Sequence, residues 1–128
     1  MEQTHSGSCL CGQIRYTVTG ALREVVACHC TQCRKQSGHY FAATSAPNDA
    51  LQIHGEDALC WYRASPPARR GFCGNCGTTL FWSHDEEDHT SILAGSLDTP
   101  TGVKLGKHIF CADKGDYYDI TDGLPCTD

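Results

Sequence analysis

Ten cysteines in 128 residues constrain this chain more than any other feature of its sequence. Seven of them form three short groups: Cys9 and Cys11; Cys28, Cys30 and Cys33; Cys73 and Cys76. Cysteines at this density form disulfides, bind metal or take part in redox chemistry. In a reducing compartment, pairs at such short spacing are metal ligands or redox groups rather than a disulfide framework. The grouping therefore predicts two zinc ions in sites of different character.

The N-terminal segment bears on the compartment. Residues 1–8 read Met-Glu-Gln-Thr-His-Ser-Gly-Ser and contain neither a basic start nor an apolar stretch. Secretory signals and membrane anchors need such an apolar stretch. We therefore expect a cytoplasmic protein that has no membrane partner.

The charge of the chain argues against nucleic-acid binding. The formal net charge is −5 with cysteines counted as neutral, and zinc-bound thiolates make the chain more acidic still. Nucleic-acid binding requires a basic stripe that displaces phosphate counterions. The sequence offers only short basic pairs, Arg34-Lys35 and Arg69-Arg70. We expect a small-molecule partner and no nucleic acid.

The length of 128 residues predicts a single zinc-binding domain over residues 1–128, because a chain this short supports one core. Its apolar segments are short and bounded by Gly, Pro, Asn or Asp, which favours strands. Within 13–18, for example, Ile14, Tyr16 and Val18 alternate with polar residues, as in a strand with one buried face. One helical turn or two is expected at Thr31–Ser37, ended by Gly38. The expected fold is a small, mostly antiparallel β-domain with strands at 13–18, 25–27, 40–44, 51–54, 59–63, 69–72, 79–83, 91–94 and 107–110.

The segment Cys73-Gly74-Asn75-Cys76-Gly77 has the form of a zinc knuckle. Its tight turn directs two sulfurs at one point, and its glycines let backbone N–H groups approach the thiolates. The natural complement is Cys9-Leu10-Cys11-Gly12, which also ends in glycine just before a predicted strand. A closed four-sulfur site on Cys9, Cys11, Cys73 and Cys76 follows. The alternative is a redox disulfide between Cys73 and Cys76, which is typical of a βαβ context that this sequence lacks.

The second group, Cys28-His29-Cys30-Thr31-Gln32-Cys33, differs in kind. Its spacing puts three sulfurs on one ion and leaves a fourth position without an adjacent ligand. Three protein ligands and an open position are typical of catalytic zinc, so Cys28, Cys30 and Cys33 are the candidate catalytic residues. The alternative is a second structural site, closed by a histidine or by a remote cysteine: Cys60, Cys111 or Cys126.

Taken together, these motifs resemble the glutathione-dependent formaldehyde-activating enzyme family, which also includes centromere protein V. The residues that carry the resemblance are Cys9–Gly12, Cys28–Arg34, Arg70–Thr78, Gly95–Asp98, Lys107–Phe110 and Asp122–Pro125. The resemblance implies a β-tent fold with a structural zinc on Cys9, Cys11, Cys73 and Cys76 and an exchangeable zinc on Cys28, Cys30 and Cys33. It also implies a carbon–sulfur lyase that reversibly condenses glutathione with formaldehyde to S-hydroxymethylglutathione.

The chemistry of a three-thiolate zinc agrees with such a reaction. Three thiolates leave the ion with a net charge of −1, so the site polarises water weakly and suits a fourth, incoming sulfur. A thiol bound there loses its proton and can attack a small carbonyl. The sequence assigns no general base: His29 and His39 lie nearby, and for each of them a structural or surface role is the alternative to proton transfer. Candidate cations for the carboxylates of glutathione are Arg34, Lys35, Arg69, Arg70 and Lys107.

Two other classes of function fit the same cysteines. A non-catalytic zinc module would bind a partner and hold both ions tightly. A zinc-exchange or redox sensor would release the ion of Cys28, Cys30 and Cys33 on oxidation.

Overall fold

The computed structural model describes residues 3–128, and strands make up most of the regular structure in this part of the chain. The strands are β1 (Thr4–Ser8), β2 (Arg15–Thr19), β3 (Val25–Cys28), β4 (Phe41–Pro47), β5 (Leu51–His54), β6 (Leu59–Ser65), β7 (Ala68–Cys73), β8 (Thr79–His84), β9 (His89–Leu93) and β10 (Leu105–Ile109).

One α-helix, α1, spans Thr31–Ser37 and ends at Gly38, as the sequence predicts. Cys30 is its N-cap, and the Cys30 sulfur accepts a hydrogen bond from the Cys33 N–H. Short 3₁₀ turns connect several strands at Asn48–Ala50, Glu56–Ala58, Ala94–Ser96 and Cys111–Asp113. No helix within residues 3–128 has both the length and the apolar character needed to cross a bilayer.

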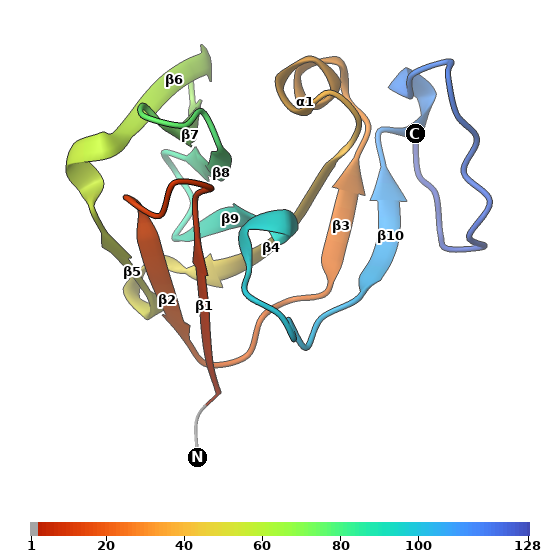
Figure 1. The fold of residues 1–128 in the computed structure, drawn as a ribbon. Helices are drawn as coiled ribbons and strands as arrows, with labels where there is room; N and C mark the ends of the chain where they lie inside the picture. Colours follow the sequence, from red (N-terminus) through yellow and green to blue (C-terminus); the bar gives the residue numbers. More distant parts are fainter. Residues whose placement is uncertain (1–2) are drawn as a thin grey trace.

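The strands form two sheets (Figure 1). A three-stranded antiparallel sheet has the order β1-β2-β5. A seven-stranded sheet has the order β10-β3-β4-β9-β8-β7-β6 and is antiparallel except for the parallel pair of β10 and β3. Figure 1 shows the large sheet bending from β6 and β7 on one side to β3 and β10 on the other. The predicted fold class, mostly β with antiparallel sheets and one short helix, is confirmed.

Strand β1 is the one element of the sheets that the sequence analysis did not predict. Its residues, Thr-His-Ser-Gly-Ser, show no apolar alternation. The strand exists because β2 offers its edge for antiparallel pairing, with Gly7 opposite Tyr16. A Cβ on Gly7 would overlap the Tyr16 ring, so glycine is the residue that permits this close approach.

The main core lies between the two sheets. Tyr16 and Phe81 meet edge to face with ring centroids 5.6 Å apart, and the Tyr16 hydroxyl is 2.6 Å from Ser96 Oγ. Burial raises the pKa of Tyr16 to about 12. The buried members of this core are Cys9, Ile14, Tyr16, Val18, Ala46, Cys73, Leu80, Phe81, Ile92 and Leu97. Two of the predicted zinc ligands are therefore part of the core itself.

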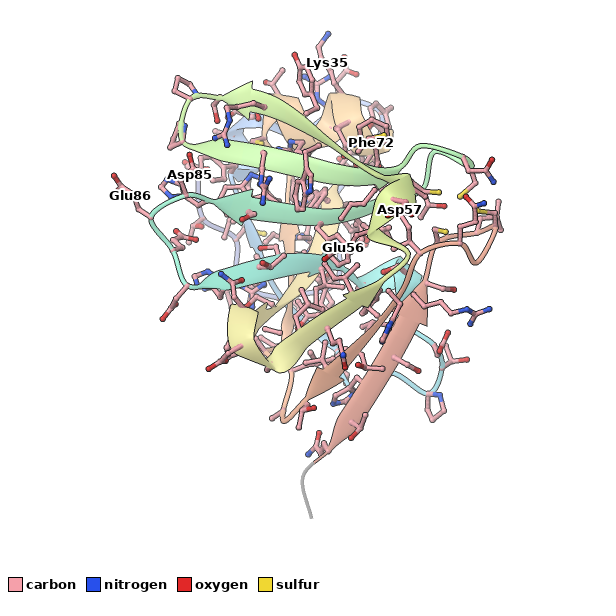
Figure 2. All side chains as sticks on the ribbon, turned by 90° about the vertical axis from the view of Figure 1, so that its left-hand side faces the viewer. Lys35, Glu56, Asp57, Phe72, Asp85 and Glu86 are labelled. Atoms are coloured by element: carbon pink, nitrogen blue, oxygen red, sulfur yellow. The ribbon has the colours of Figure 1, made fainter. Side chains whose placement is uncertain are left out.

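The acidic run Asp85–Asp88 forms the turn between β8 and β9. Figure 2 shows Asp85 and Glu86 pointing outward at this end of the hairpin. Asp85 forms an ion pair with Arg63 on β6, with 2.8 Å between Asp85 Oδ2 and Arg63 Nη1, and both side chains are about half exposed. The run is a solvated hairpin tip, and an exposed pair of this kind contributes little to stability.

Candidate metal centres

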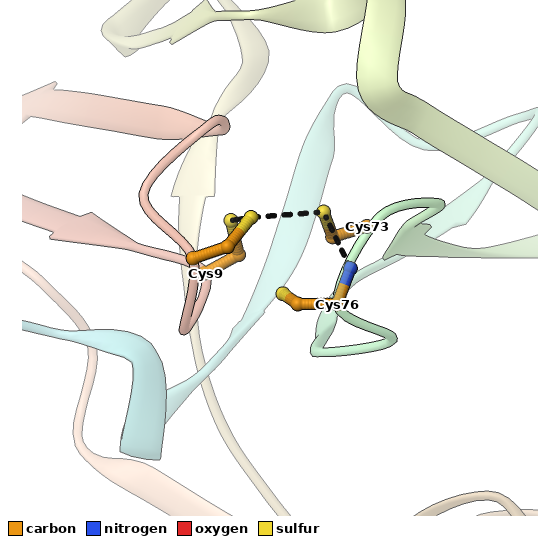
Figure 3. Close-up of side chains that lie close together, drawn as sticks. Cys9, Cys73 and Cys76 are labelled. Carbon is orange, nitrogen blue, oxygen red and sulfur yellow. Dashed lines mark hydrogen bonds between the residues drawn. The ribbon is translucent and has the colours of Figure 1, made fainter.

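The first cysteine cluster joins two turns that are far apart in the sequence. Cys9 and Cys11 lie in the turn between β1 and β2, whereas Cys73 ends β7 and Cys76 lies in the turn to β8. Each turn is closed by a backbone hydrogen bond, from Gly12 N–H to Cys9 O and from Gly77 N–H to Cys73 O. Gly77 has a φ of 80°, the left-handed conformation that this turn requires. Figure 3 shows Cys9 facing Cys73 and Cys76 across the gap between the turns.

The sulfur spacing of this cluster suits a tetrahedral metal site. All four Sγ atoms lie within 4.8 Å of one another. Cys9 and Cys11 Sγ are 3.6 Å apart, and Cys11 and Cys73 Sγ are 3.8 Å apart. A Zn–S bond of roughly 2.3 Å in tetrahedral geometry places sulfurs about 3.8 Å apart, whereas a disulfide needs roughly 2 Å. The cluster is therefore suited to zinc, and Cys73 and Cys76 are free thiols.

The surroundings of these sulfurs lower the pKa values of Cys11 and Cys76 and raise that of Cys73. Backbone N–H groups of Ile14 and Cys76 lie 3.3 and 3.4 Å from the sulfurs of Cys9 and Cys73. A hydrogen bond from Thr78 is the main cause that lowers the pKa of Cys76 to about 5. Cys9 is 2% exposed and Cys73 is fully buried. Oriented N–H groups thus compensate sulfur charge at a site that is joined to the core.

The second cluster, Cys28, Cys30 and Cys33, is built around the start of α1. Cys28 ends β3, Cys30 caps the helix, and Cys33 lies in its first turn. Their three Sγ atoms also lie within 4.8 Å of one another. Hydrogen bonds from Cys28 and Arg70 lower the pKa of Cys33 to about 6, whereas burial raises that of Cys30. This cluster is likewise able to hold a metal ion.

Arg70 on β7 supplies a positive charge to this second cluster. Its side chain is only 3% exposed, and its Nη2 lies 3.5 Å from Cys33 Sγ and 3.3 Å from Gln32 Oε1. The Nε and Nη1 atoms are buried without a hydrogen-bond partner. A buried guanidinium is costly unless a negative charge lies nearby. Three thiolates around one Zn²⁺ would carry a net charge of −1, which the Arg70 guanidinium would balance.

A cavity of about 520 Å³ opens beside the second cluster. All three cysteines line it, and each strand of the seven-stranded sheet contributes to its wall. The register explains this: Trp82 pairs with Ser91 on the cavity face, whereas Phe81 pairs with Ile92 on the core face. The wall residues from the sheet are Val26, Cys28, Phe41, Ala43, Ser65, Arg70, Trp82, Ser91 and Ile109.

Within residues 3–128, no histidine, carboxylate or further cysteine joins the second cluster as a fourth ligand. Cys60 lies beside Gly74, near the first cluster, where a Cβ on Gly74 would come within 2.8 Å of the Cys60 sulfur. Cys126 lies in the C-terminal segment and pairs with His108 of β10. Cys111 begins the 3₁₀ turn after β10, and its N–H donates to Thr127 O. The remote cysteines considered as closing ligands thus lie apart from the cluster.

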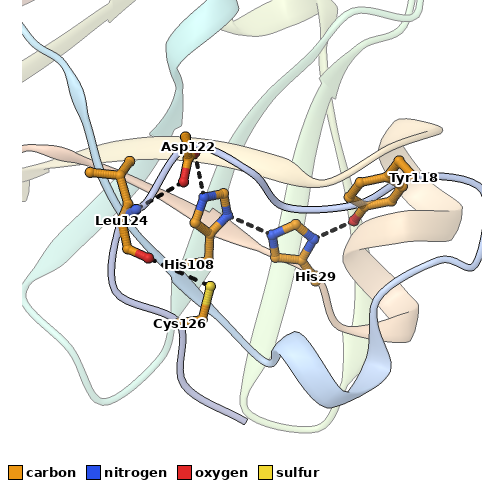
Figure 4. Close-up of polar contacts among 6 residues, drawn as sticks. All are labelled: His29, His108, Tyr118, Asp122, Leu124 and Cys126. Carbon is orange, nitrogen blue, oxygen red and sulfur yellow. Dashed lines mark hydrogen bonds and ion pairs between the residues drawn. The ribbon is translucent and has the colours of Figure 1, made fainter.

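His29 and His39 do not line the cavity. His29 is fully buried and is joined through Nδ1 to the Tyr118 hydroxyl and through Nε2 to His108 Nδ1, at 2.8 Å. His108 Nε2 is 2.8 Å from Asp122 Oδ2, which completes a continuous chain (Figure 4). Burial is the main cause that lowers the pKa of His29. This network, which the sequence did not reveal, ties the C-terminal segment to the loop between Cys28 and Cys30.

The predicted cations occupy different places. Of the five, Arg70 alone reaches the cavity. Arg69, its neighbour on β7, faces the other side of the sheet with its guanidinium 3.9 Å from the ring centroid of Trp61. Lys35 projects from α1 at the edge of the molecule (Figure 2). Arg23, which the sequence analysis did not single out, is the second cation on the cavity wall. The only sequence signal for it was its position just before the strand that ends at Cys28.

Comparisons with known proteins agree with this arrangement. The sequence profile of the glutathione-dependent formaldehyde-activating enzyme family matches residues 4–113. A protein of Schizosaccharomyces pombe named as an uncharacterized lyase is 27% identical over 119 residues, which cover 92% of this chain and 86% of that protein. A crystal structure of a Rhodobacter sphaeroides protein has the same fold, with a TM-score of 0.65 and 19% identity over 95% of this chain and 99% of that one.

The profile match contains both cysteine clusters, since it runs from β1 to the 3₁₀ turn after β10. It also contains Arg70 and every strand whose residues line the cavity. The matched segment therefore spans both clusters and the strands of the cavity wall. This chain belongs to the glutathione-dependent formaldehyde-activating enzyme family.

Proposed function

We propose that this protein is a zinc-dependent enzyme of the carbon–sulfur lyase type that adds a thiol to an aldehyde and reverses that addition. The named reaction is glutathione with formaldehyde to S-hydroxymethylglutathione. The observation that carries the proposal is the second cluster, in which three sulfurs line a cavity and no fourth protein ligand joins them among residues 3–128. The family and the lyase name of the yeast relative support the same class of reaction.

Cys28, Cys30 and Cys33 would hold the catalytic zinc. When bound there, zinc lowers the pKa of an incoming thiol and presents its sulfur as a nucleophile. In the addition, a C–S bond forms between that sulfur and the aldehyde carbon. The π electrons of the carbonyl group move to its oxygen and form an alkoxide. This alkoxide receives the proton that the thiol released. Cleavage runs the same steps in reverse.

The chain's own residues prepare the cavity for this chemistry. Arg70 holds a positive charge beside Cys33 and lowers the pKa of that thiol, which favours its thiolate form. Phe41, Trp82 and Ile109 give the wall an apolar character, which limits water around the reacting carbonyl. Because His29 and His39 lie outside the cavity, we assign neither of them a role as general base.

Cys9, Cys11, Cys73 and Cys76 would hold a structural zinc. We infer this from the position of the cluster, since Cys9 and Cys73 are core residues and all four sulfurs meet at tetrahedral spacing. We also propose a cytoplasmic location, because a reducing compartment keeps the seven ligand sulfurs available for metal.

Exchange NMR tests the reaction directly. Glutathione and formaldehyde equilibrate with their adduct spontaneously, so the measurement is the exchange rate with and without zinc-loaded protein. We expect acceleration by the wild type and none by Cys33→Ser, whose first cluster is intact. Equal rates with and without fully zinc-loaded wild type would contradict the reaction. Zinc release on oxidation by hydrogen peroxide, combined with such equal rates, would favour the zinc-exchange sensor.

A further inference from the structure

The cavity wall carries two cations among residues 3–128, of which Arg23 is exposed and Arg70 is buried. Arg70 is buried and lies against Cys33 and Gln32. Arg23 lies in the segment before β3, where its side chain is exposed at the cavity rim. A negatively charged part of any cavity ligand therefore has Arg23 as its available counter-charge.

Residues of β4 hold both the backbone carbonyl and the guanidinium of Arg23. Its carbonyl oxygen accepts a 2.6 Å hydrogen bond from the hydroxyl of the fully buried Thr44. Its Nη2 donates a 3.0 Å hydrogen bond to Ala43 O. A guanidinium held in this way loses little side-chain entropy when it binds an anion. The remaining donors keep the fork geometry that matches a carboxylate.

Among residues 3–128, none of the nearby acidic side chains forms an ion pair with Arg23. Within the described residues, no carboxylate lies within ion-pair distance of its guanidinium. Glu24, its neighbour in the sequence, has its carboxylate against Gly106 on β10. Among residues 3–128, Asp113 is the only acid on the cavity wall, and it forms no ion pair with Arg23. Burial lowers the pKa of Arg23, which an anionic ligand would offset.

The strand register gives the backbone separation along β3 between Cys28 and the residue opposite Ala43, the residue that binds the Arg23 guanidinium. Ala43, which holds the guanidinium, pairs with Val26, two residues before Cys28 on β3. At the rise of a β-strand, two residues span about 7 Å. If the sulfur of a bound thiol lies beside Cys28, the group of that thiol that contacts Arg23 is therefore about 7 Å from the sulfur.

We propose that Arg23 binds a carboxylate of the substrate thiol, and that the cavity selects thiols whose carboxylate is separated from sulfur by several bonds, as in a cysteinyl peptide. This inference rests on the proposed function, because it presumes that a thiol enters the cavity. It assigns the specificity for the thiol to a residue at the rim, away from the metal ligands.

Calorimetric titration of the zinc-loaded protein tests the assignment without turnover. The probes are glutathione and 2-mercaptoethanol, which has no carboxylate. For Arg23→Gln we expect glutathione affinity to fall about 10- to 100-fold, the effect of one charged hydrogen-bonded partner, with 2-mercaptoethanol affinity unchanged. Arg23→Lys should recover part of the loss, since it keeps the charge without the fork. Arg63→Gln is the matched control, because Arg63 pairs with Asp85 at the surface.

The outcomes separate the two proposals. Unchanged glutathione affinity in Arg23→Gln, with both thiols bound by the wild type, would overturn the role of Arg23 and leave the proposed function standing. A wild type that binds neither thiol would overturn both. Glutathione ethyl ester, in which the glycine carboxylate is masked, identifies the group. If Arg23→Gln leaves the affinity for the ester unchanged, the glycine carboxylate is the group that contacts Arg23. If Arg23→Gln lowers the affinity for the ester, the contact is the γ-glutamyl carboxylate.

Discussion

The two cysteine clusters differ in what surrounds them. The cluster of Cys9, Cys11, Cys73 and Cys76 lies against the main core, and two of its members are core residues. The cluster of Cys28, Cys30 and Cys33 lies on the opposite face of the large sheet and opens onto the cavity. One joins distant turns and the other belongs to a single loop and helix. Similar ligand chemistry thus serves the core in one place and a binding site in the other.

The charge around each cluster follows the same division. Backbone N–H groups surround the first cluster, and these are fixed by the turns. The second has, in addition, the buried side chain of Arg70, which reaches across from β7. A permanent cation suits a site whose charge changes when a thiol binds or leaves, whereas fixed N–H groups suit a site that keeps its four sulfurs.

The largest expected contrast is between Cys73→Ser and Cys33→Ser. A structural zinc contributes on the order of 10 kcal/mol to folding, so Cys73→Ser should be insoluble or unfolded. Cys33→Ser should remain soluble with native circular dichroism and retain one zinc instead of two. A well-folded Cys73→Ser protein with unchanged zinc content would break the comparison.

Metal removal should separate the clusters in time. A chelator added to the zinc-loaded protein should first take one equivalent, from the cluster that faces the cavity, with no change in circular dichroism. The second equivalent should leave only as the protein unfolds, since its ligands lie in the core. Chromogenic zinc release recorded alongside the dichroism checks this order. Simultaneous loss of both ions would contradict it.

Arg70→Gln should weaken the second site alone. Removing the charge beside Cys33 should lower zinc affinity there by about 10- to 100-fold, the range for groups that support metal ligands. Arg69→Gln is the control, because Arg69 lies on the other face of the same strand. Competition with a chelator of known affinity measures both sites. An equal loss at the four-cysteine site would show that Arg70 acts through general stability.

The smallest effect is expected from Asp122→Asn. Asp122 reaches the second cluster only through His108 and His29, so the substitution loosens the loop between Cys28 and Cys30 without removing a ligand. Zinc should leave the second site faster than in the wild type, by less than in Arg70→Gln. The first site should be unaffected. Release rates for both ions, measured under the conditions used for Arg70→Gln, test the ranking.

Local patterns predicted much of this fold. The alternation of Ile14, Tyr16 and Val18 predicted β2, and Gly38 marked the end of α1. Elements without such a pattern were missed. Strand β1 is polar and forms because β2 offers a pairing edge. The parallel pairing of β10 with β3 joins residues 80 or 81 positions apart, such as Leu105 with Val25 and His108 with Ala27, and no local signal reports such a pairing.

By itself, the sequence determined which sulfurs are available in pairs and triplets, because short spacing and turn glycines act locally. It also determined the strand-rich character of the chain. Only the tertiary structure decided which side chains from distant parts of the sequence lie beside the second cluster and its cavity. Arg69 and Arg70 are equivalent in the sequence, but successive residues on a strand face opposite sides of the sheet. Arg70 therefore meets Cys33, whereas Arg69 meets Trp61. The long-range register of the strands, which the sequence does not display, sets this choice and places Arg23 at the cavity.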